Sequence, residues 1–376
     1  MKRKKILFIF GTRPEALKMA PVILQARKDP RFESFVCLTA QHREMADQVL
    51  RLFKIKPDFD LDIMQPGQTL GDLTQRLLNK IQPVLASVKP DIVLVQGDTT
   101  TAFAGAIQSF YEKVSVGHIE AGLRSHDKYQ PFPEEINRVL VSRIADFHFC
   151  PTKESQKNLA LEGIPSKQIF VTGNTVVDAL KSIQTSVSMN DLPFDSKLMK
   201  GKRLLLITAH RRENFGAPLY SICRAIGEIV RKFPDVLAVY PVHLNPQVQK
   251  VVNEELGKEK SVLLIPPVSY EQFTALMKYS HVILTDSGGV QEEAPSFGKP
   301  VLVMREVTER PDGVALGIAK LVGTSREKIF RESVKLFSSA KEYKKMVRTK
   351  NPYGDGRASM RILDILAKRL PGGKTE

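Results

Sequence analysis

The chain lacks the features that mark membrane proteins and disulfide-stabilised secreted domains. Its 376 residues contain no apolar run that approaches the length of a membrane span. The three cysteines, Cys37, Cys150 and Cys223, have no paired spacing, which argues against a disulfide framework and against a zinc site. The apolar run at 6–10 is short and is followed by no small-residue cleavage site. We therefore expect a buried first strand of a cytoplasmic protein rather than a signal peptide.

The motifs of nucleic-acid and dinucleotide binding are also missing. The net charge is +15, from 56 Lys and Arg against 41 Asp and Glu, which is a first hint of an acidic partner. However, the basic residues are spread along the chain, apart from 2–5 and 341–350, and no base-reading or stacking motif accompanies them. The turn at 10–15 is not GxGxxG. We expect no nucleic-acid partner and no dinucleotide, and we attribute the charge to a phosphate-bearing small ligand or to a basic surface.

Two α/β domains are expected from the periodicity. Short apolar runs alternate with helical patterns, which is typical of parallel sheets covered by helices on both faces. The polar segment 184–201 interrupts this alternation and reads as a linker. We expect doubly wound, Rossmann-like domains at 1–184 and 202–356 with a cleft between them, and a last helical segment in 357–376. The expected strands are 6–10, 35–39, 92–95, 114–119, 147–150, 169–171, 203–208, 237–240, 262–265, 282–285 and 301–304.

Three carboxylates stand at ends of these elements. Asp98 and Glu120 each follow an apolar strand, and Glu134 follows Pro-Phe-Pro at the start of a helical pattern. Ligands of open α/β sheets bind where strands end, so the three acids are expected to converge and to divide the roles of base and acid. Asp98 as a helix cap and Glu134 as a helix-dipole partner are the simpler alternatives. Glu120, which precedes Ala-Gly, has no such alternative.

Basic residues accompany these acids. Arg13 follows the first strand at a helix start, where backbone N–H groups and a guanidinium favour an anion, although a solvated loop arginine remains the alternative. Lys18 lies about one helical turn further on and adds positive charge. Arg138 is four residues from Glu134 on one helix face and is expected either to hold Glu134 or to meet a phosphate.

The second domain carries histidines and a glycine turn at its strand ends. His210 comes directly after an expected strand, with two arginines behind it, and His243 has the same placement with a weaker claim. Asp-Ser-Gly-Gly at 286–289 ends a strand and opens a helix, so its backbone N–H groups suit a diphosphate. A Walker loop is excluded because no Gly-Lys-Ser/Thr follows. Glu293, one turn past Gly289, is placed to accept hydrogen bonds from ribose hydroxyls. A plain turn is the alternative for 286–289.

These motifs together resemble one known family. GTRPEALKMAP, TAQHREM, QGDTTT, HIEAGLRS, PFPEEINR, TAHRRENFG, YPVHLNP, DSGGVQEEAP and NPYGDG run from Gly11 to Gly356 in the order found in the non-hydrolysing UDP-N-acetylglucosamine 2-epimerases. The resemblance implies two Rossmann-like domains around a UDP-sugar cleft, with the helix near 357–369 packing back on the first domain. It implies no metal or nicotinamide cofactor, and a homodimer by analogy alone.

The resemblance also implies a reaction and a set of roles. UDP-GlcNAc would lose its C2 proton and UDP to give 2-acetamidoglucal, and re-addition on the other sugar face would give UDP-ManNAc. Which acid takes the C2 proton stays open. The implied acid/base set is Asp98, Glu120 and Glu134, with His210 stabilising the diphosphate or assisting proton transfer. The implied substrate and UDP ligands are Arg13, Lys18, Arg138, His243, Phe273, Ser287, Gly288, Gly289 and Glu293, with Phe273 beside the uracil.

Some members of the family bind a second UDP-GlcNAc as an activator. The matching positions here are Gln41, Glu44, Gly67, Glu134, Arg211 and His243. Glu44 stands where those members carry Gln, and Gly67 where they carry Arg, so we expect no allosteric activation and a hyperbolic rate.

Other functions remain open on the sequence alone. They are a glycosyltransferase on the same fold, a hydrolysing epimerase, a non-catalytic UDP-sugar sensor, and an epimerase of diacetamido uronate sugars. The surface polysaccharide that the product would supply is equally open.

Overall fold

The computed structural model describes residues 3–41, 43–347 and 351–370. The chain forms two compact units. Unit 1 contains the chain up to Ser182 and from Tyr353 onward, and unit 2 runs from Ile183 to Pro352. None of the described helices is both long and apolar enough to cross a membrane.

Unit 1 is built on a seven-stranded sheet in the order β3-β2-β1-β4-β5-β6-β7, with every pair parallel. The strands are β1 Lys4–Phe10, β2 Phe32–Leu38, β3 Phe59–Asp60, β4 Ile92–Gln96, β5 Ser115–Ile119, β6 Phe147–Cys150 and β7 Ile169–Val171. The helices are α1 Arg13–Lys28, α2 Arg43–Leu52, α3 Leu70–Val88, α4 Thr100–Tyr111, α5 Glu134–Ile144, α6 Lys153–Leu161, α7 Thr175–Ile183 and α15 Ala358–Arg369. The central strands are buried and largely apolar because helices cover both faces.

Unit 2 repeats the design with six parallel strands in the order β10-β9-β8-β11-β12-β13. The strands are β8 Arg203–Thr208, β9 Val236–Pro241, β10 Val262–Ile265, β11 Ser280–Thr285, β12 Val301–Val303 and β13 Ala319–Leu321. The helices are α8 Ala217–Lys232, α9 Pro246–Leu256, α10 Tyr270–Tyr279, α11 Gly288–Glu293, α12 Pro311–Ala315, α13 Arg326–Ser338 and α14 Ala340–Val347. Both strand orders are those of doubly wound Rossmann folds, so the predicted fold class is confirmed.

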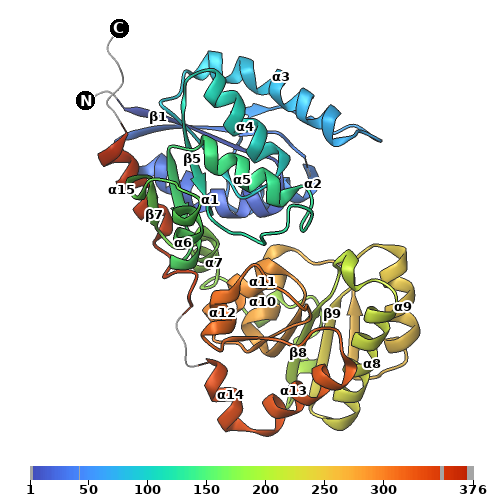
Figure 1. Cartoon of the computed structure of the whole chain (residues 1–376). Helices are drawn as coiled ribbons and strands as arrows, with labels where there is room; N and C mark the ends of the chain where they lie inside the picture. Colours follow the sequence, from blue (N-terminus) through green and yellow to red (C-terminus); the bar gives the residue numbers. More distant parts are fainter. Residues whose placement is uncertain (1–2, 42, 348–350, 371–376) are drawn as a thin grey trace. The chain divides into compact units, whose positions relative to one another are not determined.

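The chain returns to unit 1 after unit 2 and ends on it. α15 packs on α1 (Figure 1). Lys4 Nζ donates to the carbonyls of Ala367 and Leu370 at 3.0 and 2.5 Å. A lysine at the carboxyl end of a helix satisfies carbonyls that have no partner within the helix. The expectation that the last helix packs on the first domain is confirmed.

The segment 184–201, expected as a linker, belongs to unit 2. It contains two short 3₁₀ helices, Met189–Asp191 and Ser196–Met199. Lys278 Nζ on α10 donates to the carbonyls of Gln184 and Val187 at 3.0 and 2.5 Å. These bonds fix the segment on unit 2, although its sequence is polar and shows no periodicity.

Candidate active site

The functional residues predicted in unit 1 follow strands that meet at its switch point. β1 and β4 are neighbours in the sheet, and β5 pairs with β4. The connections leave β1 and β4 toward opposite directions in the strand order, which is where open α/β sheets bind ligands. Arg13 follows β1, Asp98 follows β4 and Glu120 follows β5. The structure therefore brings these three residues to one edge of the sheet.

Glu120 is a buried carboxylate on a strained backbone. Its φ of 66° lies in the left-handed region, which residues other than glycine seldom adopt unless their surroundings require it. Its carboxylate accepts hydrogen bonds from Gln96 Nε2 at 2.9 Å and Asn174 Nδ2 at 2.7 Å, and it pairs with the buried Lys18. Three donors from three elements therefore fix its position. Lys18, which we expected to serve the diphosphate, is engaged with Glu120.

Asp98 is held by an arginine and does not cap a helix. The N-cap of α4 is Thr99, whose Oγ1 accepts the N–H of Ala102 at 3.0 Å, so the alternative of Asp98 as a cap is wrong. Arg138 Nη2 donates to Asp98 Oδ2, and Arg138 Nη1 lies 3.1 Å from Glu135 Oε2. Arg138 is buried and thus joins Asp98 to α5.

Glu134 and Glu135 are the first two residues of α5, and they differ in burial and in their contacts. Glu134 is the first residue of the helix and is half-buried, which suits both the helix-dipole reading and a catalytic role. Glu135 is buried, and its carboxylate accepts the N–H groups of Ser125 and His126 at 3.1 Å. Glu135 therefore attaches the loop after β5 to the helix that carries Glu134 and Arg138.

The turn after β1 is organised by a buried glutamate. Glu15 Oε2 accepts the N–H groups of Gly11 at 3.1 Å and Thr12 at 2.8 Å, and Glu15 Oε1 accepts from Thr99 Oγ1 at 2.6 Å. Burial raises the pKa of Glu15, and these hydrogen bonds oppose the rise. Because the two N–H groups serve Glu15, the anion-binding group that this turn offers is the guanidinium of the half-buried Arg13.

His118 lies beneath the two strand-end acids. It is fully buried on β5, and its Nε2 is 2.7 Å from the carbonyl oxygen of Gly97, the residue before Asp98. Burial lowers the pKa of His118 to about 3, so the ring is neutral and donates this hydrogen bond. Gly97 has a φ of 68°, which makes the turn before Asp98 possible.

In unit 2, a buried aspartate fixes the predicted histidine. Asp286 Oδ2 accepts the N–H groups of His210 and Arg211 at 2.8 and 2.9 Å, and Asn214 Nδ2 at 3.0 Å. Its Oδ1 lies 3.4 Å from His210 Nδ1. The exposed rings of His210 and His243 are stacked, with centroids 5.9 Å apart. Both predicted histidines therefore lie together at the strand ends of unit 2.

The predicted phosphate turn lies at the start of α11. Ser287 is the N-cap, and Gly288 and Gly289 begin the helix. A Cβ on Gly288 would come within 2.8 Å of the Arg310 guanidinium, so positive charge lies directly beside this turn. Arg310 Nε also donates to Glu292 Oε1 at 2.9 Å.

Glu293 ends α11 and is oriented by a tyrosine. Tyr270 Oη donates to Glu293 Oε2 at 2.6 Å, and both residues are buried. The other oxygen, Oε1, would lie 3.4 Å from a Cβ on Gly289, so the carboxylate extends along the helix start. Phe273, predicted to lie beside the uracil, is half-buried on α10, the helix that also carries Tyr270.

The positions matched to the activator site are described only in part. Gln41 accepts a hydrogen bond from Thr101 Oγ1 at 3.1 Å, and Gly67 is exposed with a φ of 71°. The side chain of Glu44 lies outside the described residues. Burial lowers the pKa of Arg211, as do the neighbouring cations Arg305 and Arg310.

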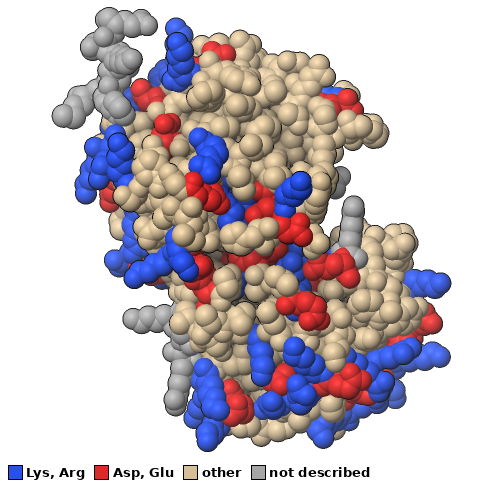
Figure 2. Space-filling view, viewed as in Figure 1, with Lys and Arg blue, Asp and Glu red and all other residues tan. Residues whose placement is uncertain are grey.

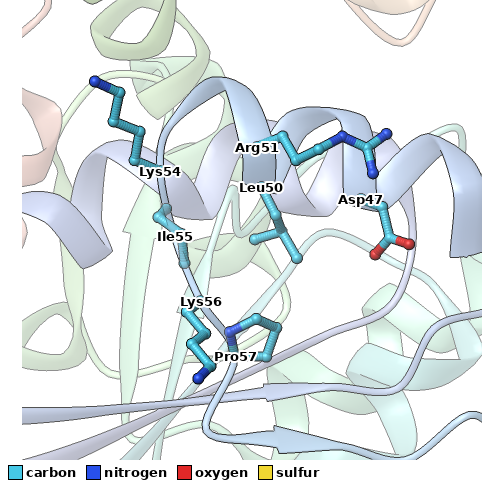
Figure 3. Close-up of a pocket in the computed structure, with 7 residues that line it drawn as sticks. All are labelled: Asp47, Leu50, Arg51, Lys54, Ile55, Lys56 and Pro57. Carbon is cyan, nitrogen blue, oxygen red and sulfur yellow. The ribbon is translucent and has the colours of Figure 1, made fainter.

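Other sites in the described residues add no chemistry. A shallow pocket of about 340 Å³ lies at the carboxyl end of α2 (Figure 3). α2 runs back from β2 toward the start of β3, so this pocket is at the edge of the sheet opposite to Asp98. Its lining residues are Asp47, Leu50, Arg51, Lys54, Ile55, Lys56 and Pro57. No group of three or more His, Cys, Asp or Glu among the described residues is arranged to hold a metal ion.

The chain is similar to a known enzyme family along most of its length. The profile of the family described as UDP-N-acetylglucosamine 2-epimerase matches residues 24–367. The chain belongs to this epimerase family. It is 51% identical over 371 residues to the UDP-N-acetylglucosamine 2-epimerase of Escherichia coli strain K12, covering 96% of this chain and 98% of that relative. It is 51% identical over 366 residues to the enzyme of the same name from Bacillus subtilis strain 168, covering 97% and 96%.

Solved structures of the epimerase family have the same fold. The structure of UDP-GlcNAc 2-epimerase from Neisseria meningitidis bound to UDP-GlcNAc superposes with a TM-score of 0.90 at 48% identity, covering 97% of this chain and 100% of that one. The Methanocaldococcus jannaschii enzyme in complex with UDP-GlcNAc and UDP gives a TM-score of 0.81 at 34% identity, covering 98% and 100%.

Several residues of this epimerase-family site were missed from the sequence. They are Glu15, Gln96, His118, Glu135, Asn174, Tyr270, Asp286 and Arg310. Asn174 and Asp286 follow β7 and β11, so the signal that singled out Asp98 and Glu120 was present for them too. The others lie inside strands, helices or later loops, where sequence position alone gives no sign of a site.

Proposed function

We propose that this chain catalyses the reversible epimerisation of UDP-N-acetylglucosamine at C2 to UDP-N-acetylmannosamine. The observation that carries the proposal is the match, along nearly the whole chain, to enzymes named for this substrate. The two strand-end carboxylates of unit 1, the half-buried Asp98 and the buried Glu120, support it, because a reaction that moves a carbon-bound proton needs fixed acid/base groups.

The proposed route is an elimination followed by an addition. A base takes the C2 proton, the electron pair of the C2–H bond forms a C1=C2 double bond, and the bond between C1 and the diphosphate oxygen breaks. UDP leaves with that bonding pair, and 2-acetamidoglucal remains. In the addition, the diphosphate oxygen attacks C1 and a proton reaches C2 on the other face. The acid/base groups of this route are Asp98, Glu120 and Glu134.

The basic residues of unit 1 divide between substrate and carboxylates. Arg13 keeps its predicted role as a phosphate ligand. Lys18 and Arg138, which we had placed on the phosphate, are assigned to Glu120 and Asp98, since their charged groups contact these acids. A carboxylate held by such a charged donor keeps one orientation during turnover.

Unit 2 is proposed to hold UDP. The N–H groups at Ser287, Gly288 and Gly289 would bind the diphosphate together with Arg310. His210 would stabilise the leaving diphosphate or assist proton transfer, with His243 beside it. The roles proposed for Glu293 and Phe273 are contacts to the ribose hydroxyls and to the uracil.

Proton NMR of UDP-GlcNAc with the protein in D2O tests the function. We expect UDP-ManNAc to form with deuterium at C2. Release of free UDP and ManNAc would indicate a hydrolysing epimerase instead. An unchanged spectrum with demonstrated UDP binding would refute the assignment for this substrate and would lead to diacetamido sugars and to acceptor screens for glycosyl transfer.

Allosteric activation by UDP-GlcNAc is not part of the proposed function. Glu44 and Gly67 stand where activated members of the family carry Gln and Arg, and Gly67 offers no side chain to a second nucleotide. The rate against UDP-GlcNAc should be hyperbolic. A requirement for added UDP-GlcNAc in the reverse direction would contradict this.

A homodimer is proposed from an exposed apolar stripe on unit 1. Phe110 on α4 and Ile136 and Leu140 on α5 are exposed, and the two helices pack together. Ile136 and Leu140 are four residues apart on one face of α5, and exposed apolar side chains grouped in this way mark interaction surfaces. Light scattering should give twice the chain mass, and Leu140→Lys should shift it to the monomer. That the enzyme works in the cytoplasm and supplies ManNAc for a surface polysaccharide stays a prediction from the sequence.

A further inference from the structure

The motif NPYGDG, residues 351–356, has no role in the chemistry above, yet it spans the return of the chain to unit 1. Its first residue belongs to unit 2. Asn351 Nδ2 donates to the carbonyl of Glu292 at 3.1 Å and to Ser296 Oγ at 2.7 Å. Glu292 lies in α11, the helix that begins at the phosphate turn and ends at Glu293. The upstream end of the motif is therefore fixed on the proposed nucleotide helix.

The downstream half of the motif is fixed in unit 1. Tyr353 is almost fully buried, and its carbonyl accepts the N–H of Asn174 at 2.6 Å. Gly354 has a φ of 143° and lies against Gly173, where an added Cβ would come within 3.3 Å of the Gly354 Cα. Glycine is favoured at both positions because their φ angles, 90° at Gly173 and 143° at Gly354, are ones that side chains rarely permit. The return segment thus packs directly on the turn that carries Asn174.

The same region is held again at the start of α15. Asp178 on α7 accepts the N–H groups of Ala358 at 3.2 Å and Ser359 at 2.8 Å. These are N–H groups of the first helical turn, which have no partner within the helix. The return segment is consequently tied to unit 1 on both sides of Gly354.

The side chain of Asn174 uses both ends of its amide. Oδ1 accepts the N–H of Val176 at 3.0 Å, and Nδ2 donates to Glu120 Oε2 at 2.7 Å. Because Val176 offers only a donor, the amide has one orientation and must present its NH₂ group to Glu120. Asn174 is only 2% exposed, so solvent does not compete for these bonds.

We propose that Asn174 is a positioning residue that holds the Glu120 carboxylate for the C2 proton step and ties it to the return segment at Tyr353. This rests on the proposed function, in which Glu120 belongs to the acid/base set. Asn174 contacts neither the sugar nor UDP in this proposal. Its effect is confined to where Glu120 lies and to how readily Glu120 ionises.

Asn174→Asp tests the proposal with little change of shape. The variant keeps the acceptor for Val176 but places a second carboxylate against Glu120, which makes ionisation of the pair harder. We expect kcat to fall about 100-fold, as for a misplaced catalytic group, and the acidic limb of the kcat–pH profile to move to higher pH. Affinity for UDP, measured by calorimetry, should stay within about twofold, because the Asn174 side chain bonds to Glu120 and Val176, neither of which is a proposed UDP ligand.

Asn158→Asp is the matched control. Asn158 Nδ2 donates to the carbonyl of Gly122 at 2.9 Å, so it supports the same loop without touching the Glu120 carboxylate. We expect this variant to keep the wild-type pH profile. Circular dichroism should show that both variants are folded. The proposal would be overturned if the kcat–pH profile of Asn174→Asp coincided with that of Asn158→Asp.

Two further variants complete the test. Asn174→Ala replaces Asn174→Asp if that variant does not fold, and Gly354→Ala tests the link to the return segment. Asn174→Ala removes the donor without adding charge, so it should lower kcat and move the acidic limb to higher pH by less than Asn174→Asp does. Gly354→Ala, which places a side chain at a φ of 143°, strains the segment beside Asn174 and should lower kcat with UDP affinity retained. Wild-type kcat in both would refute the positioning role. A wild-type protein that shows no C2 exchange in D2O would refute the proposed function itself. The exchange of the wild-type protein is therefore measured before that of any variant.

Discussion

Acidification should destabilise unit 1 through His118, a residue that the reaction itself does not use. The ordinary pKa of histidine is 6.5, and burial lowers that of His118 to about 3. Between pH 6.5 and pH 3, His118 is therefore protonated in the unfolded chain and neutral in the folded chain. The stabilising contribution is present above pH 6.5 and is lost as the pH falls toward 3. Between pH 7 and pH 4 the free energy of unfolding should fall by about 3 kcal/mol from this residue alone.

His118→Gln is the comparison that isolates this effect. A glutamine amide reaches the position of Nε2, so the donor to the Gly97 carbonyl is kept while the titrating group is removed. The variant should stay within about 1.5 kcal/mol of the wild type at pH 7, since this is the usual net worth of the one hydrogen bond that the glutamine takes over. At pH 4 the variant should be at least as stable as the wild type, because it has no histidine at position 118 whose protonation favours the unfolded chain.

Urea unfolding at pH 7, 5.5 and 4 provides the measurement. The chain contains no tryptophan, so circular dichroism is the suitable probe. His148, a further buried histidine of unit 1, also has a lowered pKa, but it is present in both proteins and cancels in the difference. Wild-type and variant curves that stay parallel from pH 7 to pH 4 would refute the argument that His118 is neutral in the folded protein.

Three further outcomes follow from the site. Glu120→Gln should lower kcat about 1000-fold and abolish deuterium entry at C2 with UDP binding kept; normal exchange would exclude Glu120 from the proton step. Tyr270→Phe removes the donor that orients Glu293 and should weaken UDP binding about 10-fold, the value of a hydrogen bond to a charged group; unchanged calorimetric affinity would remove Glu293 from the ribose site. Gly122→Ala should destabilise unit 1 by about 3 kcal/mol or more in urea unfolding, because Gly122 has a φ of 88° and a Cβ would lie 2.2 Å from the Ser155 carbonyl oxygen; a stable variant would contradict this packing.

The fold was largely predictable because its strands are buried on both faces. A strand covered by helices on both sides must be apolar throughout, and such runs are visible without any structure. The two strands that were missed, β3 and β13, are short and lie at the sheet edges, where one-sided exposure admits Asp60 and Lys320. α14 was missed as well, since none of its residues is buried.

The site was predictable only where its residues are local features of strand ends. Asp98, Glu120 and His210 stand out because each follows an apolar run. Their partners do not, since the bond from Asn174 to Glu120 spans 54 positions and the bond from Thr99 to Glu15 spans 84. These contacts depend on which strands are neighbours in the sheet. The composition of the chain does not specify the order of the strands. The spread of basic residues along the sequence also matches the surface. Lys and Arg are interleaved with Asp and Glu over the visible face (Figure 2).

Both units secure their switch points by the same device, although their sequences differ there. In unit 1 the Glu15 carboxylate takes two successive N–H groups of the turn after β1 and a hydroxyl of the turn after β4. In unit 2 the Asp286 carboxylate, after β11, takes two successive N–H groups of the turn after β8 and the amide of Asn214.

The need for such an acid follows from the sheet itself. N–H groups beyond a strand end have lost their ladder partners, and buried ones must be paired. A carboxylate satisfies several of them at once and binds two adjacent turns together. Arg13 and His210 are consequently presented from backbones that are fixed before substrate arrives, and a preorganised site of this kind spends no binding energy on ordering them.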